Sequence, residues 1–302
     1  MSQDLRGVIA PNLTPFDEDL SVATDLYVAH AKHCLDDGCV GLAPFGTTGE
    51  ALSVGIAERR ATLEALVAAG VPAARLIPGT GLTNLADTAE LTRHAVELGC
   101  AGAMTLPPFY FKGVADDGLY AYFASLIERV GQEGLRIYLY HIPQVSGVGI
   151  PPAVVRRLRA AFPAQIVGIK DSSGDWDNTK ALLEIEGLIV YPGSELPLIE
   201  ALELGARGCI TATANLNAAG IAEVIRLWDA GQRDAARQLH ERVKRIRLTV
   251  QDYAPIPAQK RILALRHGEP RWAALRPPLL PLDEAKGREL AAKLAAEAPV
   301  AA

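Results

Sequence analysis

Short β-leaning runs alternate with amphipathic helical segments along the first two-thirds of the chain. The runs recur eight times, at residues 7–12, 40–45, 76–79, 102–106, 137–142, 166–170, 188–193 and 208–212. Between them, apolar residues repeat at three- and four-residue spacing, most clearly over 56–70, 84–99 and 117–130. Because parallel strands need crossover connections, this alternation predicts a parallel sheet flanked by helices.

Two parallel architectures fit this pattern, a closed (β/α)₈ barrel and a doubly wound open sheet. Eight strands are the number that closes the barrel. The turn after the first run lacks the G-x-G-x-x-G motif typical of dinucleotide-binding open sheets, and no P-loop is present. We therefore expect an α/β fold of the (β/α)₈ TIM-barrel type.

The pattern changes after Asn215. Four helical segments, at 218–230, 234–248, 258–267 and 283–296, are separated by Pro-containing stretches. The sequence thus predicts a barrel over residues 1–215 and a C-terminal helical region over 216–302 packed on it.

Composition narrows the class of protein. The 302-residue chain is 49% hydrophobic and carries a net charge of −5, without a basic run. Nucleic-acid or membrane-surface partners are therefore not expected. No apolar stretch approaches the roughly 20 residues of a membrane span, and the first residues lack a signal peptide's apolar region. We expect a cytoplasmic protein whose four cysteines are reduced core residues.

Polar residues at the ends of the predicted strands carry the functional information, because barrel active sites lie there. The six histidines are dispersed, so no metal site is expected. His141 is the only strand-end candidate for a base and lacks an evident serine nucleophile, which argues against a Ser-His-Asp triad.

Lys170 is then the leading nucleophile. It ends the apolar run 166–170, and burial among aliphatic neighbours disfavours the ammonium form that cannot attack a carbonyl. Tyr140, one strand away, could move protons, and the turn from Gly46 to Gly49 offers hydroxyls and N–H groups for an anion. Each feature alone also has a structural interpretation: a solvated lysine, an interior aromatic residue, a simple turn. Their convergence at one end of the barrel favours a site.

Around these residues the chain resembles the dihydrodipicolinate synthase / N-acetylneuraminate lyase family of (β/α)₈ Schiff-base enzymes. GTTGE at 46–50, YHIP at 140–143 and GIKDSSGD at 168–175 match three of its motifs in order. PIPAQK at 255–260 and the later RPPLLPL resemble its C-terminal region.

The resemblance implies a role for each matching residue. Lys170 would form the Schiff base with a 2-oxo acid such as pyruvate, without cofactor or metal. Tyr140 would shuttle protons with Thr47 hydrogen-bonded to it, and Thr48 with the N–H of Thr47 would hold the carboxylate. Tyr110 matches a tyrosine that reaches across a dimer interface, so a homotetramer or homodimer is expected.

Departures from the family pattern bear on the substrate. Val145 occupies the position where lysine-pathway synthases carry an arginine for a second carboxylate. Of the polar groups that neuraminate lyases use, Glu195 remains, while Ala212 replaces a serine. We expect Val145, Gly193, Glu195 and Thr211 to face the variable part of the substrate.

These observations predict a class I lyase that forms or cleaves a C–C bond of a 2-oxo acid, such as a 2-keto-3-deoxy sugar acid or a related 2-oxo acid. The alternatives are dihydrodipicolinate synthase (4-hydroxy-tetrahydrodipicolinate synthase), an imine-forming dehydratase or deaminase, and a catalytically silent 2-oxo-acid-binding protein.

Overall fold

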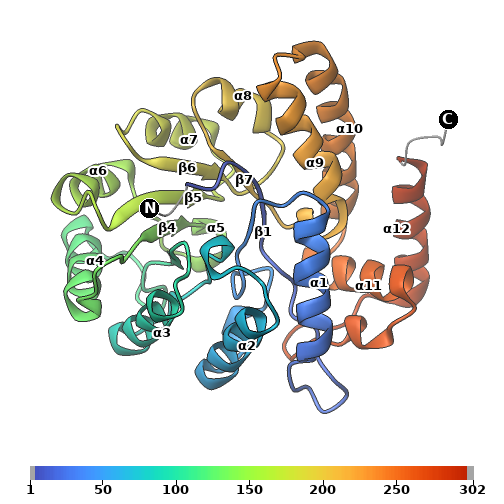
Figure 1. The fold of residues 1–302 in the computed structure, drawn as a ribbon, viewed down its shortest axis with the longest axis horizontal. Helices are drawn as coiled ribbons and strands as arrows, with labels where there is room; N and C mark the ends of the chain where they lie inside the picture. The colour runs from blue at the N-terminus through green and yellow to red at the C-terminus, as the bar shows by residue number, and fades with distance from the viewer. Residues whose placement is uncertain (1–3, 298–302) are drawn as a thin grey trace.

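A computed structural model describes residues 4–297 and has a ring of parallel strands surrounded by helices (Figure 1). The strands are β1 (Gly7–Ala10), β2 (Gly41–Leu42), β3 (Ala103–Thr105), β4 (Ile137–His141), β5 (Ile166–Asp171), β6 (Ile189–Pro192) and β7 (Gly208–Ile210). Hydrogen bonding orders them β2-β1-β7 and β3-β4-β5-β6, all in parallel. The expected TIM barrel is confirmed.

The predicted strand at 76–79 joins these two sheets. It forms isolated parallel bridges from Leu76 to Leu42 and from Gly79 to Met104. Backbone bonds run from Ile77 N to Leu42 O and from Met104 N to Pro78 O, both 2.8 Å. Pro78 has no N–H to donate, which interrupts a regular ladder here.

Helices cover the outside of the ring. They are α1 (Thr24–Asp36), α2 (Ile56–Ala68), α3 (Leu85–Glu97), α4 (Asp116–Val130), α5 (Pro143–Ser146), α6 (Pro152–Ala161), α7 (Trp176–Leu183), α8 (Leu198–Glu203), α9 (Ala214–Asp229), α10 (Arg233–Gln251), α11 (Pro255–His267) and α12 (Glu284–Ala296). Short 3₁₀ turns are η1 (Ala51–Ser53), η2 (Ala73–Arg75) and η3 (Pro270–Ala273). The chain leaves α2 and α3 through Gly70 and Gly99, whose φ angles of +89° and +78° suit glycine.

The predicted boundary at 215/216 falls inside α9, which begins at Ala214 and packs against β1. This helix belongs to the strand–helix repeat of the barrel, and the added helices follow it. In Figure 1, α10 and α12 lie outside the ring, at its right-hand side. The division into two domains stays a prediction, and residues 1–3 and 298–302 of the two ranges lie outside the described part.

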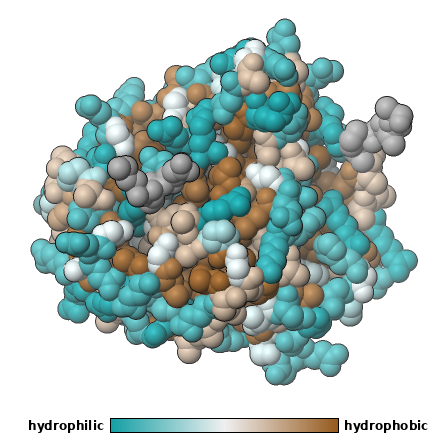
Figure 2. Space-filling view, viewed as in Figure 1, coloured by the Kyte–Doolittle hydropathy of each residue, from teal (hydrophilic) through white to brown (hydrophobic). Residues whose placement is uncertain are grey.

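Strand alternation divides the core into two layers. Inside the ring, strands contribute side chains such as Ile9, Met104, Val167 and Ile210. Between strands and helices, aliphatic residues form two larger clusters. On the face shown in Figure 2, hydrophobic residues gather near the middle of the molecule and hydrophilic residues cover the outer helices.

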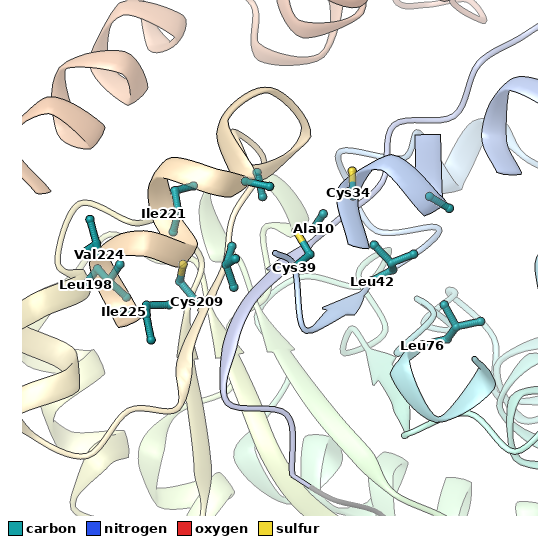
Figure 3. Packing of buried hydrophobic residues seen from close by; sticks show 14 of the residues in the cluster. Ala10, Cys34, Cys39, Leu42, Leu76, Leu198, Cys209, Ile221, Val224 and Ile225 are labelled. Carbon is teal, nitrogen blue, oxygen red and sulfur yellow. The ribbon is translucent and has the colours of Figure 1, made fainter. Parts of the chain in front are cut away.

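The four cysteines behave as apolar residues. Cys34, Cys39 and Cys209 are buried among aliphatic side chains such as Leu42 (Figure 3), and Cys100 is half-buried. Burial raises the pKa of Cys39 and of Cys100 to about 12, which disfavours their reactive thiolate forms. The expectation of free core cysteines agrees with this packing.

Within residues 4–297, no helix combines the length and the apolar character needed to cross a membrane.

Candidate active site

The register between β4 and β5 brings two reactive side chains together. Tyr140 pairs with Lys170 across the parallel ladder, so both project from the same face. In β4, Leu139 packs outward against the helices, whereas Tyr140 belongs to the cluster inside the ring. Alternation thus directs Tyr140 and Lys170 into the barrel near the carboxyl ends of their strands, where TIM-barrel active sites lie.

Three side chains form a continuous polar contact there. The Lys170 amine donates to the Tyr140 hydroxyl over 3.4 Å, with Nζ 4.4 Å from the ring centroid. The Tyr140 hydroxyl lies 3.2 Å from Thr47 Oγ1. Lys170 is only 4% exposed and Tyr140 3%. Both side chains are thus held away from bulk water at the carboxyl ends of their strands.

The turn after β2 holds Thr47 in place by an unusual backbone path. Phe45 and Glu50, on either side of the turn, adopt φ angles of +58° and +52°, which few non-glycine residues do. A Cβ atom at Gly79 would lie 2.0 Å from the Phe45 carbonyl oxygen, so only glycine fits beneath the turn. Within residues 4–297, the N–H groups of Thr47 and Thr48 make no backbone or side-chain hydrogen bond. They remain available for an anion.

A cavity of about 250 Å³ opens above these residues. Thr47 and Tyr140 form part of its wall, together with Val145 from α5. Two wall residues, Ile256 and Leu279, come from the C-terminal region, so that region helps to build the site. Val145 is 63% exposed and lines this space, while its contact with a substrate stays a prediction.

A buried ion pair supports the same turn and was not predicted from the sequence. Lys260 Nζ of α11 donates to Glu50 Oε1 over 2.6 Å, and both side chains are fully buried. Burial raises the pKa of Glu50 and lowers that of Lys260 to about 8, although their mutual attraction opposes both changes. The feature that could have pointed to this pair is a lysine in the middle of a helical segment, Pro257 to Ala264, whose other residues are mostly buried.

The other predicted substrate-binding residues lie away from the cavity wall. Glu195 is fully buried and accepts hydrogen bonds from the hydroxyls of Thr211 and Thr213. The Gly193 N–H donates to the Asp171 carbonyl over 2.6 Å. A role for Gly193, Glu195 and Thr211 in substrate binding stays a prediction.

Tyr110 is also outside the wall. It lies in the loop after β3, is 74% exposed and makes an edge contact of 5.4 Å with the Phe111 ring. Thr48 is half-buried in the turn beside Thr47.

His141 stabilises a loop through a backbone hydrogen bond and, among the described residues, contacts no candidate nucleophile. Its Nδ1 accepts the Ile150 N–H over 2.8 Å, and burial lowers its pKa, so the neutral ring braces the loop after β4. Across residues 4–297, no three His, Cys, Asp or Glu side chains are grouped as metal ligands would be.

Comparison with known proteins places this geometry in a family. The model of the dihydrodipicolinate synthetase family matches residues 4–297. A DapA-like lyase of Chloroflexus aurantiacus is 37% identical over 280 residues, covering 92% of each chain. The chain belongs to the dihydrodipicolinate synthetase family. It is accordingly a class I, Schiff-base lyase of the aldolase type, as the resemblance implied.

Solved structures agree with the fold. Dihydrodipicolinate synthase from Agrobacterium tumefaciens superposes with a TM-score of 0.87 at 33% identity, covering 96% of this chain and 98% of its own. A prophage protein of the same family from E. coli, solved in complex with pyruvate, gives 0.88 at 26% identity, covering 98% and 99%.

Proposed function

We propose that Lys170 of this lyase forms an imine with the 2-oxo group of a pyruvate-containing substrate, with Tyr140 and Thr47 as its proton relay. The observation that carries the proposal is the buried contact from the Lys170 amine through the Tyr140 hydroxyl to Thr47. A tyrosine between an amine and a second hydroxyl can accept a proton from one neighbour while it donates to the other.

The chemistry follows from the imine. The Lys170 amine adds to C2 of the 2-oxo acid and water leaves, with the proton supplied through Tyr140. In a 4-hydroxy-2-oxo acid the C4 hydroxyl then loses its proton, the C3–C4 bond breaks, and its electron pair moves into the iminium. An aldehyde departs and leaves an enamine, which is protonated at C3 and hydrolysed to pyruvate and free Lys170. Synthesis runs the same steps in reverse.

The turn after β2 is the proposed carboxylate site. Thr47 and Thr48 belong to this turn, their N–H groups make no hydrogen bond within residues 4–297, and the Thr48 hydroxyl would add a third donor. An anion bound by backbone N–H groups needs no cationic side chain. This arrangement would hold the carboxylate of pyruvate beside its reacting carbonyl.

Trapping with borohydride tests the proposal. Reduction converts an imine into a stable secondary amine, so pyruvate plus borohydride should add one reduced pyruvate unit to the intact protein, located on Lys170 by peptide mass spectrometry. Lys170→Ala should fold normally, take up no adduct and lose turnover. An unchanged adduct or retained turnover in this variant would refute the assignment.

Three alternatives use the same pocket. Val145 offers no cation for the second carboxylate of a dihydrodipicolinate synthase substrate. A dehydratase or deaminase would release water or ammonia instead of an aldehyde. A silent binding protein would form the adduct without turnover of any 2-oxo acid.

We further propose a cytoplasmic homotetramer or homodimer. The exposed aromatic pair Tyr110 and Phe111 supports a subunit contact, since large exposed aromatic groups are typical of interfaces. Light scattering with size-exclusion chromatography would measure the oligomeric state.

A further inference from the structure

The cavity beside Thr47 and Tyr140 has a mostly apolar wall, and Lys170 reaches this wall through its contact with the Tyr140 hydroxyl. Its volume of about 250 Å³ is below the roughly 300–1,000 Å³ of pockets for drug-sized ligands, so the substrate is small. The side chains around its mouth are aliphatic or aromatic: Leu52, Leu106, Phe109, Val145, Ile256 and Leu279. They come from loops after three strands and from the C-terminal region, so no single motif reveals them.

The wall provides no counter-ion for a second negative charge. Among residues 4–297, the one acidic or basic side chain in it is that of Glu50, whose carboxylate pairs with Lys260. Lys112, near the mouth, donates to the carbonyl oxygens of Ser146, at 2.6 Å, and Phe109. A carboxylate on the far end of the substrate would lose its water without gaining a cation.

The wall is also poor in partners for a chain of hydroxyls. The Ser146 hydroxyl faces the carbonyl oxygens of Ile142, at 3.0 Å, and Val148, at 2.7 Å, and is already engaged. Thr47 and Tyr140 belong to the reacting end. Of the hydroxyls in the described wall, that of Ser53 remains. A polyhydroxylated substituent would leave most of its groups unpaired, which is unfavourable in a desolvated site.

We infer that the aldehyde half of the substrate is apolar, an aromatic or branched aliphatic group of about one ring in size. The preferred substrate is then a 4-hydroxy-2-oxo acid with that group on C4, cleaved to pyruvate and an uncharged aldehyde by the steps given above. No oxidant or reductant is needed, because the electron pair of the broken bond ends in pyruvate. The inference rests on the proposed function and, among the expected 2-oxo acids, favours one less polar than a sugar acid.

A substrate panel tests it with the full chain. Pyruvate release would be followed with lactate dehydrogenase for three 4-hydroxy-2-oxo acids, whose C4 substituents are phenyl, carboxylate and the polyol of 2-keto-3-deoxygluconate. The phenyl compound should have the highest kcat/KM, by about tenfold or more. A preference for the polyol or the carboxylate would overturn the inference.

Val145→Arg supplies the missing cation at the mouth and should move the phenyl-to-carboxylate ratio of kcat/KM at least tenfold toward the carboxylate. The matched control Val145→Leu adds apolar bulk and should keep the preference for phenyl. If Val145→Arg does not fold by circular dichroism, Leu52→Arg places the cation at another residue of the cavity wall, whose side chain is 61% exposed. An unchanged ratio in a folded arginine variant would contradict the assignment.

Borohydride trapping distinguishes failure of this inference from failure of the proposed function. A pyruvate adduct on Lys170 together with preference for a polar substrate would contradict the inference and leave the proposed function in place. No adduct and no cleavage of any panel member would contradict the proposed function, and therefore also the inference that rests on it.

Discussion

The Tyr140 hydroxyl has two neighbours of different chemistry, an amine at 3.4 Å and a threonine hydroxyl at 3.2 Å. A single hydroxyl can donate to one of them and accept from the other. Its ring also lies over Lys170 Nζ, at 4.4 Å, so removal of the oxygen alone leaves the packing around the amine in place. Removal of the Tyr140 hydroxyl alone therefore separates a role in proton transfer from a role in positioning the amine.

Tyr140→Phe should lower kcat by roughly 10²–10⁴, because the variant lacks the group that moves protons to and from the imine. Steady-state rates with the best substrate of the panel would measure this loss. Tyr138→Phe is the matched control: it removes a hydroxyl from the same strand and interior face, outside the cavity wall, and should stay within about threefold of the parent rate. A Tyr140→Phe rate near the parent value would return Tyr140 to a packing role.

At the scale of elements, the ion pair between Glu50 and Lys260 joins the turn after β2 to α11. The turn carries Thr47, and α11 carries Ile256, so one buried contact aligns the reacting end of the cavity with its mouth. The pair also lies against Phe16, whose ring centroid is 4.4 Å from Lys260 Nζ.

Lys260→Met should reduce the free energy of unfolding by about 3–5 kcal/mol, because it leaves the Glu50 carboxylate buried without a cation. Urea denaturation would measure the change. The double variant Glu50→Leu/Lys260→Met should recover much of it, since no buried charge remains. The surface pair of Lys180 with Asp177 gives the comparison: Lys180→Met should cost less than about 1 kcal/mol. Equal effects of the two methionine substitutions would contradict the central role of the buried pair.

The order of elements could be predicted because each leaves a local pattern. Apolar runs marked the strands, and three- and four-residue spacing marked α2, α3 and α4 within a few residues of their observed bounds. Lys170 and Tyr140 could be named because each is a reactive side chain near the carboxyl end of such a run. Glu50 with Lys260, and the positions of Ile256 and Leu279, depend on packing between distant segments, which no local spacing encodes. For the same reason, the sequence could not tell that Thr211 and Thr213 would enclose Glu195.

At the scale of the whole molecule, His30 joins three distant parts of the chain. It lies on α1, its Nε2 is 2.8 Å from Asn215 Oδ1 in α9, and its ring meets the Trp272 ring of η3 at 5.0 Å. Burial lowers its pKa to about 4, from an ordinary value of 6.5. The native protein therefore holds this imidazole neutral where the unfolded chain would protonate it.

Stability should consequently fall as the pH drops from about 6.5 to about 4. In this window the unfolded state binds more protons than the native state, so the free energy of unfolding rises with pH and is lost on acidification. The full difference corresponds to about 3 kcal/mol for a shift of this size. Thermal or urea unfolding at several pH values would show a shallower acid limb in His30→Gln. Identical slopes in His30→Gln and the parent protein would exclude His30 as the cause.

The contribution of α11 and the segment after η3 to the cavity has a consequence for the synthesis of the protein on the ribosome. Lys170 emerges well before Lys260 and Leu279, so a nascent or truncated chain holds the nucleophile but lacks part of the cavity mouth and the cation for Glu50. Such a chain retains a buried carboxylate without a partner, which favours the unfolded state. The reactive amine is thereby assembled into a complete pocket only after the segment that carries Leu279 has been made, and shorter fragments should be less stable than the full chain.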